Sequence, residues 1–148
     1  MTNTNVFPVN GIDFRISTAG RSGAFSDFHV VRGMESFSIS FDNGIEEWNP
    51  IDAFGWARRM VTTKGISVAI SGKRVVGCVG NDYVAGLAFG SGDVLNTVLQ
   101  VNFPNGDVLR VPCVVNVTAC GGGGSGDVAV LEFECLSDGA PSYSSEGV

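Results

Sequence analysis

An alternation of apolar and polar residues runs through the C-terminal part of the chain and constrains the fold more than any other feature. In residues 94–103, 108–119 and 129–135, most odd-numbered positions are apolar and most even-numbered positions are polar. A side-chain period of two is typical of β-strands, in which successive side chains point to opposite faces. The three segments are therefore predicted to be long strands that share one buried face and one polar face.

The segments between and around these strands have the composition of turns and shorter strands. Residues 104–107, Pro-Asn-Gly-Asp, are typical of a β-hairpin turn. The glycine-rich run at residues 121–126 is predicted to be a flexible turn, and it has no lysine that would make it a nucleotide-binding loop. Pro112 lacks an N–H and predicts a bulge or a stretch without a ladder partner. Further alternation predicts strands at residues 11–18, 35–41 and 66–71. Residues 19–33 have no sustained period and could be a long loop with a short strand around residues 28–31.

One segment, residues 46–65, is predicted to be an α-helix. Asn49 can cap its N-terminus and Pro50 suits its first turn. Apolar residues at helical spacing predict a stripe that lies on a sheet, and three large side chains, Phe54, Trp56 and Met60, are predicted to pack there. An aspartate at position 56 or 60 would then bring a charge into the core, and we expect it to prevent folding.

The whole chain, residues 1–148, is predicted to be one domain with three segments that have no clear pattern. Residues 1–11 and 137–148 are interpreted as terminal arms, and the glycine-rich residues 73–92 as a long assembly loop. Because loops tolerate shortening, deletion of residues 79–90 is expected to leave a folded monomer that cannot polymerise. The residues predicted to carry the function of this loop are Lys73, Arg74, Asn81, Asp82 and Tyr83.

The charge distribution argues against nucleic-acid binding. The net charge is −6, and residues 1–74 hold eight of the nine basic side chains and seven acidic ones, a net charge of +1. Residues 75–148 hold eight acidic side chains and only Arg110, a net charge of −7. Nucleic-acid-binding proteins concentrate Lys and Arg. An acidic and a mixed surface could support head-to-tail self-association, and a solvated acidic face without a partner explains the charges equally well.

The sequence offers little evidence for catalysis, a metal or a cofactor. The four cysteines include no CxxC pair, so reduced thiols are favoured over a metal site. No apolar run approaches the length of a membrane-spanning helix, and the N-terminus does not resemble a secretory signal, so synthesis in a cytoplasm is expected. We predict that the protein is not an enzyme and needs no cofactor. The candidates weighed for chemistry are His29, Glu46 with Glu47, Glu132 with Glu134, and Asp82.

Several stretches of the sequence resemble one protein family. EEWNPIDAFGWARRM at residues 46–60, SGKR at 71–74, GNDYVAG at 80–86 and LEFECLSDGAPSY at 131–143 are similar to the tail tube (major tail) proteins of long-tailed bacteriophages. The similarity covers most of the chain in order, although the motif-rich part is about a third of it. The pattern of this family suggests an acidic residue at position 78, and Cys78 departs from it.

The resemblance implies a mainly β fold, a β-sandwich or partial barrel with one flanking α-helix that oligomerises into a β-lined tube. It also implies that six subunits form a ring and that rings stack into a conduit for DNA in the virion. The implied partners are other copies of the chain, a tape measure protein and tail terminator or distal tail proteins. A tube subunit of a phage-tail-like bacteriocin would have the same features.

The tube interpretation predicts which residues line the channel. The even-numbered face of the C-terminal strands would face the lumen, where acids and amides keep DNA phosphates hydrated and unbound. Arg110 is the exception, and a pair with Glu132 or Glu134 would neutralise it. A monomeric β-sandwich binding module, for instance for carbohydrate, is the second interpretation, and an enzyme is the third. The predicted lumen-facing residues are Asn96, Gln100, Asn102, Asn116, Glu132 and Glu134.

Overall fold

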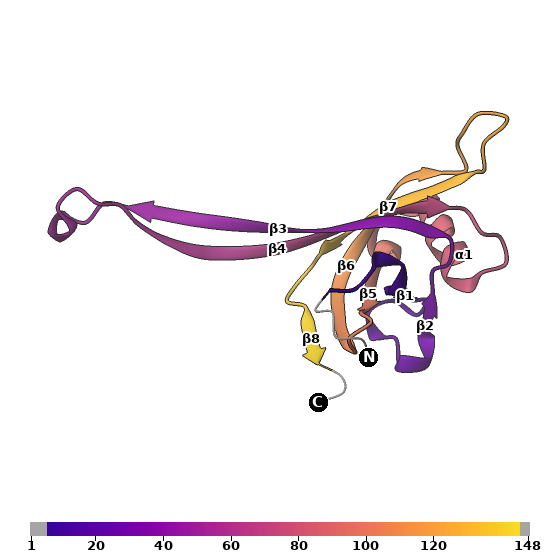
Figure 1. Ribbon diagram of the computed structural model, residues 1–148, viewed down its shortest axis with the longest axis horizontal. Helices are drawn as coiled ribbons and strands as arrows, with labels where there is room; N and C mark the ends of the chain where they lie inside the picture. The colour runs from indigo at the N-terminus through magenta and orange to yellow at the C-terminus, as the bar shows by residue number, and fades with distance from the viewer. Residues whose placement is uncertain (1–5, 146–148) are drawn as a thin grey trace.

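The computed structural model describes residues 6–145 and has one antiparallel sheet with an unusually long hairpin (Figure 1). The strands follow the order β2-β1-β5-β6-β7-β4-β3, and β8 pairs with β6. Within the described residues there is one α-helix, α1 (Val79–Gly86), and no helix is both long and apolar enough to cross a bilayer. The strands are β1 (Asp13–Ser17), β2 (Phe28–Val30), β3 (Met34–Trp48), β4 (Arg58–Lys73), β5 (Asn96–Asn102), β6 (Asp107–Cys120), β7 (Val130–Ser137) and β8 (Ser142–Ser145).

Strand β6 joins two layers, because its two halves pair with different strands. Its first half pairs with β5 and continues to β1 and β2, whereas its second half pairs with β7 and continues to β4 and β3. Phe14 of β1 and Phe37 of β3 meet edge to face, with ring centroids 4.8 Å apart. Pro112 lies between the residues of β6 that pair with β8 and those that pair with β7, so its missing N–H costs no ladder bond there.

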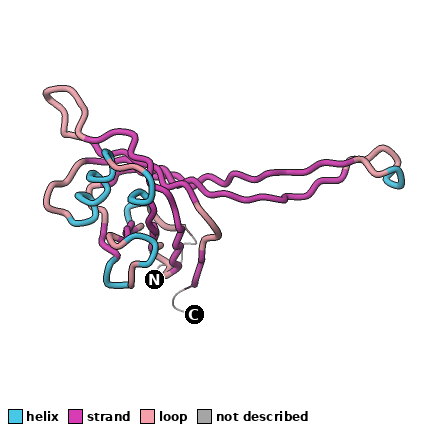
Figure 2. The backbone as a smooth tube through the Cα atoms, turned by 180° about the vertical axis from the view of Figure 1, so that it is seen from behind, coloured by secondary structure: helices cyan, strands magenta, loops and turns pink. Residues whose placement is uncertain are grey.

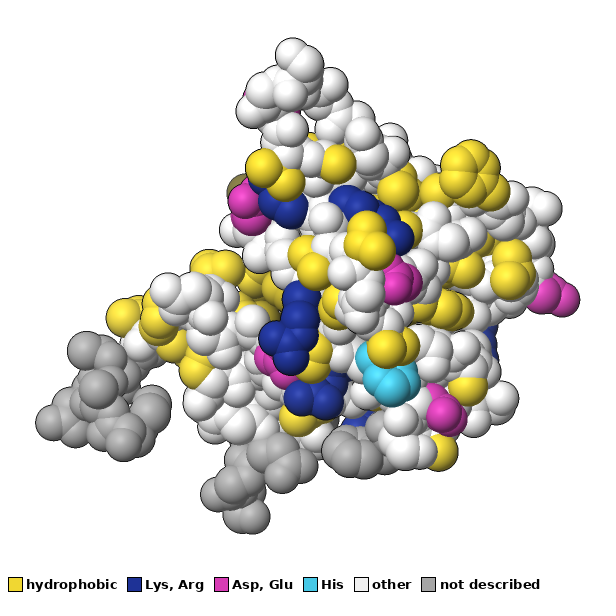
Figure 3. Space-filling model, turned by 90° about the vertical axis from the view of Figure 1, so that its right-hand side faces the viewer, with side chains coloured by type: hydrophobic (Ala, Val, Ile, Leu, Met, Phe, Trp, Pro, Cys, Tyr) yellow, Lys and Arg dark blue, Asp and Glu magenta, His cyan; other side chains and the backbone are white. Residues whose placement is uncertain are grey.

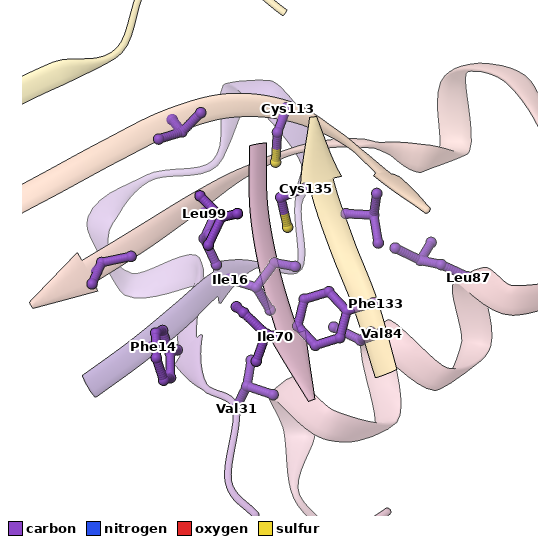
Figure 4. Close-up of a cluster of buried hydrophobic side chains, with 14 of the residues drawn as sticks. Phe14, Ile16, Val31, Ile70, Val84, Leu87, Leu99, Cys113, Phe133 and Cys135 are labelled. Atoms are coloured by element: carbon purple, nitrogen blue, oxygen red, sulfur yellow. The ribbon is translucent and has the colours of Figure 1, made fainter. Parts of the chain in front are cut away.

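The core confirms the alternation seen in the sequence. The odd-numbered residues of β5, β6 and β7 point inward, and β1 and β4 contribute the facing side chains (Figure 4). Helix α1 packs against β1, β2 and β6 and adds Val84. The fold is therefore mainly β with one flanking helix, as expected. Fully buried apolar residues include Ile16, Val68, Leu99, Val101, Val111, Cys113, Val115, Leu131 and Cys135.

The helix predicted at residues 46–65 is wrong, because this segment is the distal part of the β3–β4 hairpin. Ile45 pairs with Val61 and Glu47 with Arg59 across the two strands. Pro50 has an extended backbone rather than a helical one, and Phe54 and Gly55 both have positive φ, at 52° and 89°. A right-handed helix cannot pass through two consecutive residues with positive φ.

The segment predicted to be a long loop, residues 73–92, instead holds α1 and the 3-10 helices Leu87–Phe89 and Gly92–Leu95. Val84 and Leu87 of this segment are buried in the core. Deletion of residues 79–90 would remove these buried side chains and open a large cavity, which argues against a folded product. The effect of the deletion on folding and assembly stays a prediction. Gly80 shows how closely α1 approaches β2, since a Cβ there would lie 2.4 Å from the carbonyl oxygen of Val30.

The described parts of both terminal arms lie against the body. The C-terminal segment forms β8, which pairs with Asp107–Arg110 of β6. Its Tyr143 hydroxyl donates to Asp107 Oδ2 at 2.6 Å, and this hydrogen bond raises the pKa of Tyr143. The ring centroid of Phe103 lies 6.1 Å from that of Phe7 and 6.4 Å from that of Tyr143. Residues 1–5 and 146–148, the outer ends of the two predicted arms, lie outside the described residues.

Candidate interaction surfaces

The hairpin arm, defined here as residues 42–65, extends well beyond the body and ends in a short 3-10 turn (Figure 2). Strand β4 pairs with β7 only from Ser67 onward. The arm is therefore a two-stranded ribbon without a third strand. Isolated two-stranded hairpins are marginal in water, so the arm needs contacts that residues 6–145 of this chain do not supply to it.

Large apolar side chains cover the hairpin arm and are exposed to solvent. Three of them lie at the tip, where Ile51 is 98%, Phe54 is 91% and Trp56 is 78% exposed. Contiguous exposed apolar surface of this kind is a mark of an interaction site. The prediction that Phe54, Trp56 and Met60 pack on the sheet is thus wrong, because the long hairpin carries all three away from the body, Phe54 and Trp56 in its tip and Met60 in β4. The remaining exposed apolar residues of the arm are Ile45, Trp48, Met60 and Val61.

One face of the hairpin arm continues the core face of the sheet. Phe41 pairs with Ile66 at the base, and Ile45 pairs with Val61 further out. A register shift after Gly44 places Ile45 and Val61 together on this same face, whereas Met60 and Trp48 pair with Glu46 and Arg58 on the other face. The Arg59–Glu47 ion pair, at 3.0 Å, follows on the same face nearer the tip. The apolar face that the body covers elsewhere is therefore left uncovered on the arm.

The opposite face of the β6–β7–β4–β3 layer is polar. Asn116 Nδ2 donates to Glu134 Oε1 at 3.0 Å, and Ser36 and Ser71 are hydrogen-bonded at 2.7 Å. A shallow groove of about 250 Å³ runs between Ser36 and Glu132. Three of the residues predicted to share one face, Asn116, Glu132 and Glu134, lie together here, as the register requires. The other members of this polar face are Ser38, Ser40, Ser67, Ala69 and Thr118.

The remaining residues of the predicted lumen face lie on β5, where the face is partly covered. Gln100 is only 3% exposed: its Oε1 accepts from Arg110 Nε at 2.8 Å, and its Nε2 donates to Asn102 Oδ1 at 2.9 Å. Asn96 and Asn102 are half-buried. The predicted pair of Arg110 with Glu132 or Glu134 is wrong, because Arg110 lies in the half of β6 that pairs with β5. Its guanidinium lies 5.7 Å from the ring centroid of Phe28.

Three of the five residues predicted for the assembly loop form one hydrogen-bonded network. Asn81 is fully buried; its Oδ1 accepts from Val75 N at 3.1 Å and from Arg74 Nη1 at 2.8 Å. Its Nδ2 donates to the carbonyl oxygens of Arg32 and Lys73 at 2.9 and 3.1 Å. Arg74 also pairs with Asp82 at 2.7 Å. The network ties α1 to the end of β4.

The other two residues of that prediction have separate contacts. Lys73 Nζ pairs with Glu35 Oε1 at 3.2 Å, and Tyr83 packs against the edge of the core. The basic Lys73 and Arg74 are thus both paired with acids of the first two thirds of the chain. Contacts of these five residues with a second copy stay a prediction.

On the side opposite the hairpin arm, basic side chains gather around the single histidine (Figure 3). A groove there is lined by Arg15, His29 and Arg32 together with Cys78. Arg15 pairs with Asp13 at 3.0 Å, and the Cys78 thiol donates to the carbonyl oxygen of Val30. In residues 6–145, no three side chains of His, Cys, Asp or Glu are placed to hold a metal ion. The Cys78 contact joins the start of α1 to β2, and the Arg15 pair lies within β1.

The two buried cysteines, Cys113 and Cys135, are neighbours in the core (Figure 4). The interaction with Cys113 and burial raise the pKa of the Cys135 thiol well above its ordinary value. A thiol held in the protonated form is a poor nucleophile and a poor metal ligand. Cys135 is therefore part of the packing.

Sequence reasoning missed the hairpin arm as the most exposed apolar feature. The signal was present in residues 58–64, where β-branched Val61, Thr62 and Thr63 favour a strand. Apolar residues at helical spacing in the turn, around Phe54 and Trp56, outweighed that signal.

No protein-family model matches the sequence, and no curated protein matches it. Solved structures do match. A chain from the tail of an empty gene transfer agent particle, computed with C6 symmetry, has a TM-score of 0.73 and 18% identity and is aligned over 94% of this chain and 99% of that chain. A chain from the virion of a native gene transfer agent particle has a TM-score of 0.69 and 15% identity, with the same two coverages.

A third similar structure comes from an extracellular contractile injection system, the PVC sheath–tube complex in its extended state. It has a TM-score of 0.60 and 13% identity and is aligned over 97% of this chain and 94% of that chain. These likenesses extend over nearly the full length of both partners in each comparison. At such low identity they establish the fold, and the chain has the fold of a phage-tail-tube-like protein.

Proposed function

We propose that this chain is a structural subunit of a tail tube, which self-assembles into hexameric rings that stack into a conduit for DNA. The observation that carries the proposal is the hairpin arm, whose large apolar side chains have no cover within the described residues. A surface of this kind on a chain with the tail-tube fold favours contact with further copies of the same chain. The role is structural rather than enzymatic.

The strand arrangement supports closure of the β6–β7–β4–β3 layer between copies. Strand β3 ends the strand order, and the second half of β6, beyond Val114, has no strand on its other edge within the described residues. All three pairs in this layer are antiparallel, so β6 of a neighbouring copy would also run antiparallel to β3. Pairing these edges would satisfy their N–H and C=O groups and remove an aggregation hazard.

Repetition of this contact would produce a wide barrel. Four strands from each of six copies make about 24 strands, more than the 16–18 strands of porins that already leave an aqueous channel. One of the similar particles, the tail of the empty gene transfer agent particle, was computed with sixfold symmetry. The polar face with Asn116, Glu132 and Glu134 would then line the lumen, and the core and α1 would lie outside it.

The expected partners follow from a tube of defined length that passes DNA. A tape measure protein and tail terminator or distal tail proteins would contact the ends or the interior of the tube. The location would be the virion, with synthesis in the host cytoplasm. A bacteriocin tube would have the same subunit design without DNA.

Electron microscopy of the purified chain, with and without the hairpin arm, tests the proposal. The parent chain should form rings or tubes at high concentration. A variant in which residues 45–62 are replaced by Asn-Gly joins the paired residues Gly44 and Thr63, and it should remain folded and monomeric because the core residues lie outside the arm. A parent chain that stays monomeric at all concentrations would contradict the proposal and favour a β-sandwich binding module.

A further inference from the structure

An apolar groove lies at the base of the hairpin arm. Phe41 and Ile66 line one side, and Ala140 and Pro141 of the β7–β8 connection line the other; the volume is about 450 Å³. The backbone N–H of Ile66 donates to Ser137 Oγ at 2.8 Å, which fixes the connection against the hairpin. Phe41 is 62% exposed at this groove. The groove is therefore preformed, and Phe41 is its exposed apolar wall.

The tip of the hairpin arm is an apolar projection of defined shape. Three successive turn hydrogen bonds hold it, from Ala53 N to Pro50 O, from Phe54 N to Ile51 O and from Trp56 N to Ala53 O, at 3.2, 3.3 and 3.0 Å. Phe54 has a left-handed backbone, and its side chain is almost fully exposed. A pre-organised tip loses less conformational entropy when it binds than a flexible one.

The charges beside these two surfaces are complementary. Lys64 lies at the rim of the groove, and Asp52 lies at the tip next to Ile51. Neither takes part in any of the ion pairs formed among the described residues. A cation at the groove and an anion on the projection fix which surface meets which.

The tip cannot occupy the groove of its own chain. The strands of the arm separate the two surfaces by about eight residues, or roughly 30 Å of extended chain. The occupant must therefore come from another molecule, and a second copy supplies a tip of matching shape and charge. A tip-to-base contact joins two different surfaces, so it is heterologous and repeats from copy to copy.

We propose that the tip of one copy, with Ile51, Phe54 and Trp56, sits in the groove at the base of the next copy's hairpin arm, with Asp52 beside Lys64. This inference rests on the proposed tube function and names the receptor for the arm. The contact covers the exposed tip of the arm and the exposed Phe41 of the groove at once. It also explains why the groove is lined by the β7–β8 connection, which sequence alone marks only as a terminal arm.

Disulfide cross-linking tests the contact in the assembled full-length chain. In a background with Cys78→Ser and Cys120→Ser, chains with only Phe54→Cys are mixed with chains carrying only Ala140→Cys, and copper phenanthroline is added as the oxidant. Covalent dimers of the two chain types are expected on non-reducing gels. A chain that carries both Phe54→Cys and Ala140→Cys is expected to give a ladder of cross-linked oligomers. The matched control pairs Phe54→Cys with Ser91→Cys, which is exposed in the turn before β5, and should give no ladder.

A charge swap provides a second readout. Asp52→Lys and Lys64→Asp should each raise the concentration needed for assembly about fivefold, and the double swap should restore it to within about twofold, as for a partly exposed ion pair. If the parent chain assembles but the Phe54→Cys and Ala140→Cys chains do not cross-link, or the double swap does not restore assembly, this inference is overturned and the tube proposal stays intact. A parent chain that never assembles overturns both.

Discussion

Asn81 is the side chain on which the position of α1 depends most. Its amide makes four hydrogen bonds, to backbone groups of Arg32, Lys73 and Val75 and to the Arg74 guanidinium. Asn81→Leu keeps the volume but leaves these buried groups without partners, so we expect a loss of about 3 kcal/mol in the free energy of unfolding. Denaturant titration measures the loss.

Asn43→Leu is the matched control for Asn81, because Asn43 lies exposed on the hairpin arm. We expect it to change the free energy of unfolding by less than about 0.5 kcal/mol. Equal stability of the two variants would show that the network around Asn81 does not hold the helix. Gly80, the residue before Asn81, allows α1 to approach β2 closely. Gly80 and Asn81 therefore both help to hold α1 against the sheet.

At the scale of elements, the hairpin arm exposes side chains that would be buried in the helix predicted from its sequence. Trp56 is 78% exposed, so Trp56→Asp should fold and unfold like the parent, within about 0.5 kcal/mol. Assembly should weaken strongly, because the variant places a charge in the intersubunit contact. Thermal unfolding measures the stability, and light scattering measures the assembly.

Val128→Asp, at a residue 62% exposed near the β6–β7 turn, is the control and should change neither the stability nor the assembly. An unfolded Trp56→Asp chain would mean that the arm is covered within the monomer.

At the scale of the whole molecule, the polar face of the β6–β7–β4–β3 layer determines how DNA would pass. Glu132 and Glu134 are its acidic groups on β7, and positive charge there would bind phosphates with a strong salt dependence. Glu132→Lys combined with Glu134→Lys should permit tube assembly but slow DNA ejection, most severely at low salt. Ejection assays on particles built with this double variant measure the effect.

The control for the lumen variant combines Asp93→Lys with Asp127→Lys, which makes the same charge change at two exposed residues outside the sheet. It should eject DNA like the parent. Unchanged ejection from tubes shown to contain the Glu132 and Glu134 variant would place these carboxylates away from the channel.

The sequence by itself determined the strands whose pattern is local. Alternation in β5, β6 and β7 predicted both their buried residues, such as Leu99 and Phe133, and the shared polar face with Asn116 and Glu134. A period of two is a property of the strand itself, so no tertiary information was needed to see it. The resemblance to tail tube proteins likewise indicated a fold that the solved structures support.

Only the tertiary structure decided where the helix lies and what the hairpin arm exposes. Residues 46–65 and 79–86 both have mixed propensity for helix and strand. In the first segment, Arg59 is part of a strand because it pairs with Glu47 across the hairpin. In the second segment, the helix buries Asn81 and Val84. Weak local preferences are overridden by packing. The groove of Phe41, Ile66 and Pro141 also joins segments far apart in the chain, and such a surface exists only once the sheet has brought them together.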